Sequence, residues 1–122
     1  MAFAALALGG AVGGPALAQD EVDFEAEVWP ILMDNCVVCH GPVDSFGELR
    51  LDSKEGILKG GKNGKIVVPG EPEKSPMYVR TSLPADDLDI MPAEGDPLTP
   101  EQVELIRRWI AGGAELGEWA GL

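Results

Sequence analysis

The sequence has few of the residues that build metal clusters and aromatic cores. Among 122 residues it contains two cysteines, one histidine and 6% aromatic residues, beside 16 glycines and 10 prolines. A chain of this length is enough for one domain with a modest core. The shortage of aromatic side chains predicts a thin, loop-rich core. A bound apolar group would complete such a core, and folding would then depend on that group.

Strand signals are also sparse, and neither a βαβ pattern nor an internal repeat is present. Short apolar stretches with helical spacing alternate instead with Gly/Pro-rich loops. This pattern predicts an all-α fold made of short helices.

The two cysteines and the histidine stand together, in the run Cys36-Val37-Val38-Cys39-His40. Two thiols at this spacing can each add to a vinyl group of haem and form two thioether bonds. The adjoining imidazole can then bind the iron as proximal ligand. A C-x-x-C-H run is typical of c-type haem attachment.

Three alternatives use the same residues. A structural zinc site needs four ligands, and the run offers three, so a carboxylate would have to complete it. A dithiol redox motif is expected near a βαβ pattern and gives His40 no role. A plain disulfide between Cys36 and Cys39 leaves the histidine unexplained as well. The sequence therefore favours one haem c held by Cys36, Cys39 and His40.

The first 19 residues carry no charged side chain. Ala16-Leu17-Ala18 matches the small-residue signature of an export-signal cleavage site, although no Lys or Arg precedes the apolar run. The run is short and interrupted by glycine, unlike a membrane span. We therefore expect an export signal over residues 1–18, a single domain over residues 19–122 and a periplasmic or otherwise exported location. An uncleaved N-terminal anchor is the alternative.

Four helices are expected. Apolar spacing predicts a helix over residues 20–35, kinked or restarted at Pro30 and delivering Cys36 at its end. Thr99-Pro100-Glu101-Gln102 predicts a capping box that opens a helix ending at Gly112-Gly113, with Trp109 packed in the core. The other two are a short helix between Ser53 and Gly60 and one opened by Ser75 as N-cap and Pro76.

A sixth ligand to the iron must come from outside the motif. Since His40 is the only histidine, methionine is the next candidate. Met33 is too close to Cys36 to reach the opposite haem face, and Met77 lies in an expected helix where core packing explains it. Met91 stands in a polar loop and is followed by Pro92. Met91 is the preferred distal ligand, with Met77, or an open, lysine or water site, as alternatives.

Charge is distributed unevenly along the chain, whose formal net charge is −12. Residues 81–106 contain seven acids and no Lys or Arg, whereas residues 50–74 contain six basic and four acidic residues. The acids are Asp86, Asp87, Asp89, Glu94, Asp96, Glu101 and Glu104. If Met91 binds iron, these acids flank the haem and favour a redox protein partner with a basic docking surface. A merely solvated acidic surface is the alternative, and nucleic acid is disfavoured because its phosphates would be repelled.

Beyond the motif, further short runs of characteristic residues lie between about residue 24 and residue 114, a range that covers nearly all of the chain after the predicted signal. They are Val28-Trp29-Pro30-Ile31-Leu32, Gly47-Glu48-Leu49-Arg50-Leu51-Asp52-Ser53, Gly60-Gly61, Val68-Pro69-Gly70, Ser75, Arg80, Met91-Pro92 and Trp109-Ile110-Ala111-Gly112-Gly113-Ala114. Together with the motif they resemble the planctomycete-type cytochrome c domain.

The resemblance implies a class I-like fold of short helices and loops wrapped round one haem. It also implies Cys36 and Cys39 as thioether sites, His40 as proximal ligand and Met91 as distal ligand. Two features differ from the family. Its members are often modules of much larger proteins, and the proline run that usually follows the distal Met is reduced to Pro92.

Arg50 and Arg80 are candidates to neutralise the haem propionates, because a guanidinium can bind a carboxylate through two parallel hydrogen bonds. A surface ion pair is the alternative for each.

The sequence as a whole favours an exported monohaem electron carrier rather than an enzyme. The alternatives are a haem enzyme or gas-sensing module with a labile distal ligand, and an electron-entry module of a larger complex.

Overall fold

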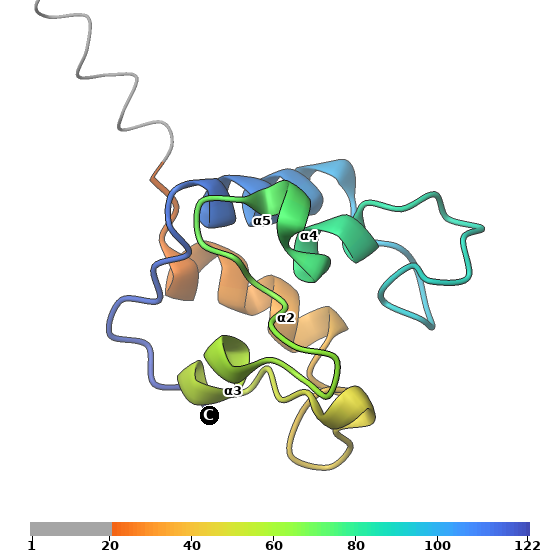
Figure 1. The fold of residues 1–122 in the computed structure, drawn as a ribbon, viewed down its shortest axis with the longest axis horizontal. Coiled ribbons are helices and arrows are strands. Elements are labelled where there is room, and N and C mark those ends of the chain that lie inside the picture. Colours follow the sequence, from red (N-terminus) through yellow and green to blue (C-terminus); the bar gives the residue numbers. More distant parts are fainter. Residues whose placement is uncertain (1–20) are drawn as a thin grey trace, which may run out of the picture.

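The computed structural model describes residues 21–122, so the predicted export signal over residues 1–18 lies outside the described part. Within that part the chain is helical and forms no strand, only three isolated bridges, which confirms the all-α prediction (Figure 1). The elements are a π-helical turn η1 (Phe24–Val28), α2 (Trp29–Asn35), the 3₁₀ turn η2 (Phe46–Glu48), α3 (Lys54–Lys59), the 3₁₀ turn η3 (Pro72–Lys74), α4 (Pro76–Thr81) and α5 (Pro100–Ala111).

The N-terminal helix begins at Phe24, later than the sequence predicts, and its first turn is π-helical. The carboxylate of Asp23 caps it by accepting the Ala26 N–H at 3.1 Å. The helix changes to α-type next to Pro30, in the first turn of α2, as expected of a residue that lacks an N–H and whose ring crowds the preceding turn. α2 ends where predicted, with Cys36 as its C-cap.

The two short middle helices also lie where the sequence places them. Ser53 caps α3 by accepting the Gly56 N–H at 3.0 Å, and Gly60 ends the helix at a φ of 81°. Ser75 is the N-cap of α4 by position, but its hydroxyl does not cap the helix. It accepts the Val68 N–H at 2.8 Å and donates to the Glu71 carbonyl at 2.9 Å. The predicted N-cap position of Ser75 is therefore confirmed, while the side-chain cap bond expected of such a residue is absent.

α5 begins with the predicted capping box. The Thr99 hydroxyl accepts the Gln102 N–H at 3.1 Å, and the Gln102 side chain accepts the Thr99 N–H at 2.9 Å. α5 packs against η1 and α4. Its buried residue Trp109 donates its indole N–H to the Glu115 carbonyl at 2.7 Å.

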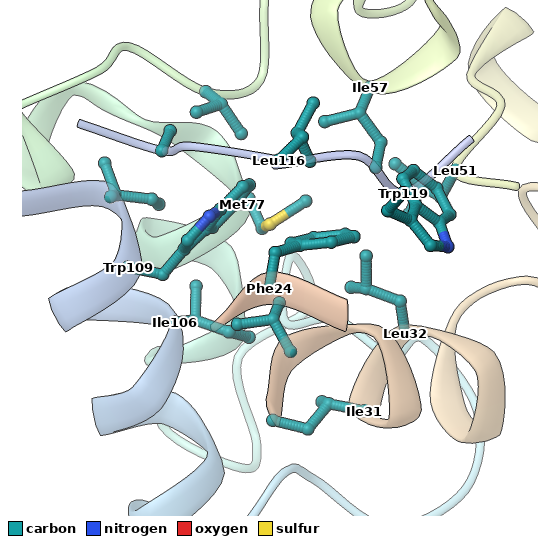
Figure 2. Close-up of a cluster of buried hydrophobic side chains, with 14 of the residues drawn as sticks. Phe24, Ile31, Leu32, Leu51, Ile57, Met77, Ile106, Trp109, Leu116 and Trp119 are labelled. Carbon is teal, nitrogen blue, oxygen red and sulfur yellow. The ribbon is translucent and has the colours of Figure 1, made fainter. Parts of the chain in front are cut away.

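An aromatic cluster forms one side of the core. Phe24 lies between Trp109 and Trp119, with ring centroids 5.0 Å and 4.8 Å away, and Trp29 contacts Trp119 at 4.8 Å (Figure 2). The predicted core packing of Trp109 is confirmed.

The C-terminal segment returns to the start of α3 (Figure 1). Gly121 forms a bridge with Ser53, and the Leu122 N–H donates to the Asp52 carbonyl at 3.0 Å. Over residues 21–122 no helix has the length and apolar character needed to cross a membrane.

Candidate functional site

All the functional candidates except Arg50 line one cavity of about 480 Å³. Its lining includes the motif residues Cys36, Cys39 and His40, and also Met77, Arg80 and Met91. Buried core residues such as Leu32, Leu51 and Ile106 form part of the wall. This volume lies within the range of about 300–1,000 Å³ that is typical of sites for organic ligands.

The motif forms a helical turn that continues from α2. The N–H groups of Cys39 and His40 both donate to the Cys36 carbonyl, at 3.2 Å and 2.9 Å. Since residues three and four apart share a helix face, this turn brings both thiols and the imidazole to the same cavity. The two cysteines form no disulfide, so both thiols are available.

His40 is oriented by a backbone carbonyl. Its Nδ1 lies 3.0 Å from the Phe46 oxygen, and a carbonyl only accepts, so Nδ1 carries the proton in this contact. In the neutral imidazole, the other ring nitrogen, Nε2, then carries no proton and can bind a metal. A contact to a main-chain oxygen leaves no mark in the side-chain sequence, and therefore sequence reasoning did not find Phe46.

The turn after the motif depends on a glycine. Gly41 is buried, and its N–H donates to the Asp44 carbonyl at 2.7 Å. A Cβ at this position would overlap the Val37 carbonyl, within the motif turn. The Leu51 N–H also donates to the His40 carbonyl at 2.8 Å, which ties the motif to the core.

The thiol of Cys36 is hard to ionise. Burial, and secondarily the neighbouring Cys39, raises the pKa of Cys36 to about 11. Because the thiolate is the form that exchanges disulfides, a thiol that stays protonated disfavours the dithiol redox alternative. Within residues 21–122, no group of three or more His, Cys, Asp or Glu side chains is arranged to hold a metal ion.

Met77 and Met91 both line the cavity but differ in their setting. Met77 lies on α4, is 8% exposed and belongs to the hydrophobic core. Met91 lies in the segment between α4 and α5, half-buried, and is followed by a cis peptide bond to Pro92. Met77 thus has the core role that its helical position predicts, while Met91 lines the cavity without belonging to the buried core.

The two candidate arginines lie in different places. Arg50 does not line the cavity, and its guanidinium pairs with the buried Asp52. Arg80 lines the cavity and donates from Nε to the Asp89 carbonyl at 3.0 Å. Lys62 and Lys65 also line it, two further cations that sequence reasoning did not single out.

Comparison with known proteins identifies the family. Residues 36–95 match the family model described as planctomycete cytochrome C. The chain carries a planctomycete-type cytochrome c domain. No curated protein and no solved structure matches the sequence.

The match starts at Cys36 and ends at Gly95, so it contains both the attachment motif and Met91 of this cytochrome domain. Membership in the family implies covalently bound haem c and a role in electron transfer. The residues present fit that cofactor. A partly apolar cavity of ligand size carries two unpaired thiols and an imidazole whose Nδ1 is already engaged.

Proposed function

We propose that this chain is an exported, class I-like monohaem electron carrier whose haem c is bound by Cys36 and Cys39, with His40 and Met91 as the axial ligands. The observation that carries the proposal is that Met91 and the C-x-x-C-H turn line the same cavity. Bound haem would supply reversible one-electron exchange at its iron.

The chain's own residues contribute binding and orientation. The two thiols anchor the group covalently, and the Phe46 carbonyl holds the imidazole of His40 so that Nε2 is free to bind. A thioether ligand raises the potential of haem iron relative to harder ligands. A site closed by Met91 also leaves no open position for oxygen chemistry, which favours a carrier over an enzyme.

The cations at the cavity wall favour binding of the haem propionates. Arg80, Lys62 and Lys65 all line it, whereas Arg50 is engaged by Asp52. Among the two arginines first considered, Arg80 is therefore the one we propose for the propionates.

The proposal is tested by expressing the chain in a host that matures c-type cytochromes. Denatured protein on a gel should stain for haem through its peroxidase activity, and the oxidised protein should show the weak long-wavelength band of sulfur-to-iron ligation. Carbon monoxide added to the reduced protein separates carrier from gas sensor or haem enzyme. Slow or absent binding supports the carrier, and rapid binding at neutral pH contradicts it.

We further propose that the partner presents a basic surface. Residues 82–99 contain Asp86, Asp87, Asp89, Glu94 and Asp96, and Glu94 itself lines the cavity. In the middle of these acids the Leu88 side chain is fully exposed. A basic protein with a small apolar recess would complement this surface, and the charges would raise the rate of encounter.

Charged small-molecule redox reagents test this without the partner. A cationic ruthenium ammine should react faster than ferricyanide at low salt. The difference between the two rates should shrink when added salt shortens the Debye length below about 10 Å. Replacing Asp86 and Asp96 by Asn should reduce the difference more than replacing Glu25 and Glu118 by Gln. Both pairs remove two charges from exposed residues, and neither Glu lines the cavity. Equal effects would show an undirected acidic surface instead.

A further inference from the structure

Met91 lies in a segment that has no helix of its own. Residues 82–99 connect α4 to α5, and most of their side chains are exposed. A segment of this kind is expected to be more mobile than the helices it joins. A weak thioether ligand on such a segment would detach often unless specific contacts held it against the cavity.

Arg80 makes two such contacts. Its carbonyl, in the last turn of α4, accepts the Met91 N–H at 3.0 Å, and its Nε donates to the Asp89 carbonyl at 3.0 Å. The first contact uses a helix-end carbonyl, one of the last four that have no partner within a helix. The two bonds flank Ile90, which is buried. One residue at the end of α4 thus holds the chain on both sides of the buried anchor.

The same stretch is closed from its other end by Asp87. Its carboxylate Oδ1 accepts the Asp89 N–H at 2.8 Å, and its carbonyl accepts the Ile90 N–H at 3.2 Å. The three consecutive N–H groups of residues 89–91 are therefore all bonded. Arg80 supplies the connection of this turn to a helix, and Asp87 supplies the bonds within the turn.

We infer that Arg80 is a positioning residue for Met91: its side chain fixes the 89–91 turn on α4 and so keeps the thioether at the cavity. The inference rests on the proposed function, because Met91 must be the distal ligand. It concerns the Nε bond to Asp89, which a substitution can remove while the backbone bond between Arg80 and Met91 remains.

Imidazole is a suitable probe, because it competes with Met91 for the same position. Its apparent dissociation constant depends on the fraction of molecules in which Met91 is detached. Arg80→Gln should lower that constant about tenfold, the effect expected for one hydrogen bond from a charged donor. The midpoint of helix unfolding, followed by far-ultraviolet circular dichroism, should change little. A general loss of stability would shift both measurements together.

The matched control is Arg107→Gln on α5. The Arg107 guanidinium pairs with Glu104, and Arg107 does not line the cavity. The apparent dissociation constant of imidazole for Arg107→Gln should equal that of the wild type. If Arg80→Gln bound imidazole with the same apparent dissociation constant as Arg107→Gln and the wild type, the inference would be overturned.

Because Arg80 is also proposed for the propionates, a second pair of variants tests the 89–91 turn with Arg80 left in place. Asp87→Ala and Asp87→Asn remove the same charge, but only Asn keeps an oxygen acceptor for the Asp89 N–H. The inference predicts tighter imidazole binding in the Ala variant than in the Asn variant, and equal constants would contradict it. Failure of the proposed function has a different signature. Wild-type protein would then stain for haem but lack the sulfur-to-iron band.

Discussion

The guanidinium of Arg50 binds the carboxylate of Asp52 through two hydrogen bonds, from Nε to Oδ1 at 2.8 Å and from Nη2 to Oδ2 at 2.7 Å. Asp52 is buried, while the Arg50 side chain is 46% exposed. The pair follows the C-x-x-C-H turn closely along the chain. The backbone carbonyl of Asp52 also accepts the N–H of Leu122, so the pair lies where the C-terminal segment meets the core.

This pair predicts how stability depends on pH. The hydrogen bond from Arg50 holds the pKa of Asp52 below its usual value, although burial opposes the effect. A carboxyl group with a lowered pKa stabilises the folded state above its unfolded pKa of about 3.9 and loses that contribution as pH falls through the folded value. Asp52→Asn should therefore lower the denaturant midpoint at pH 7, and the difference from wild type should shrink below about pH 4.

Glu104→Gln provides the comparison for that experiment. Glu104 pairs with Arg107 at 2.7 Å, but both side chains are exposed. Such pairs contribute about 0–1 kcal/mol. A constant difference between Asp52→Asn and wild type from pH 7 to pH 2 would mean that the Asp52 carboxylate contributes nothing through its charge.

Met91→Ala should abolish the sulfur-to-iron band and allow rapid carbon monoxide binding by the reduced protein. The reason is that Met91 is the cavity methionine that lies outside the helices. Absorption spectra of the oxidised and reduced variant check this. Met77→Leu is the control, since Leu keeps the apolar volume of this core position and the band should survive. A band that persists in Met91→Ala and disappears in Met77→Leu would reverse the ligand assignment.

Ser75→Ala should destabilise the fold by about 1–3 kcal/mol, the cost of leaving buried partners without a hydrogen bond. The Ser75 side chain is fully buried, and its hydroxyl is bonded to Val68 and Glu71. Guanidinium unfolding followed by circular dichroism measures the effect. Ser82→Ala, at an exposed site with a hydroxyl bonded to the Val79 carbonyl, should have little effect. If the two variants were equally stable, the Ser75 hydrogen bonds would not contribute.

Thr99→Ala should cost about 0.5–2 kcal/mol, the usual contribution of an N-cap side chain. The Thr99 hydroxyl accepts the Gln102 N–H at the start of α5, the longest helix among residues 21–122. Thr99→Ser keeps the hydroxyl and should behave like wild type in the same unfolding measurement. Equal losses in both variants would trace the effect to the methyl group.

Sequence patterns predicted the elements whose signals are local. The capping box at Thr99, the short helix that follows Ser53 and the delivery of Cys36 at the end of α2 each depend on residues in or next to one helix. The helical class and the family resemblance are also confirmed, because apolar spacing within each helix and the C-x-x-C-H motif with its accompanying short runs are local features of the sequence.

Contacts between distant segments could not be predicted in this way. Ser75 looks like a side-chain cap from the residues that follow it, but the preceding segment brings Val68 and Glu71 to its hydroxyl instead. The bonds of Arg80 to the 89–91 turn likewise join two separate segments, and no sequence pattern indicates that these segments meet.

The aromatic cluster has a practical consequence for following the folding of this protein. Trp29, Trp109 and Trp119 are its three tryptophans, and all belong to the cluster around Phe24. Intrinsic fluorescence will therefore report the junction of the N-terminal helix, α5 and the C-terminal segment. An emission change that precedes the loss of helical signal would identify this junction as the first part of the molecule to open.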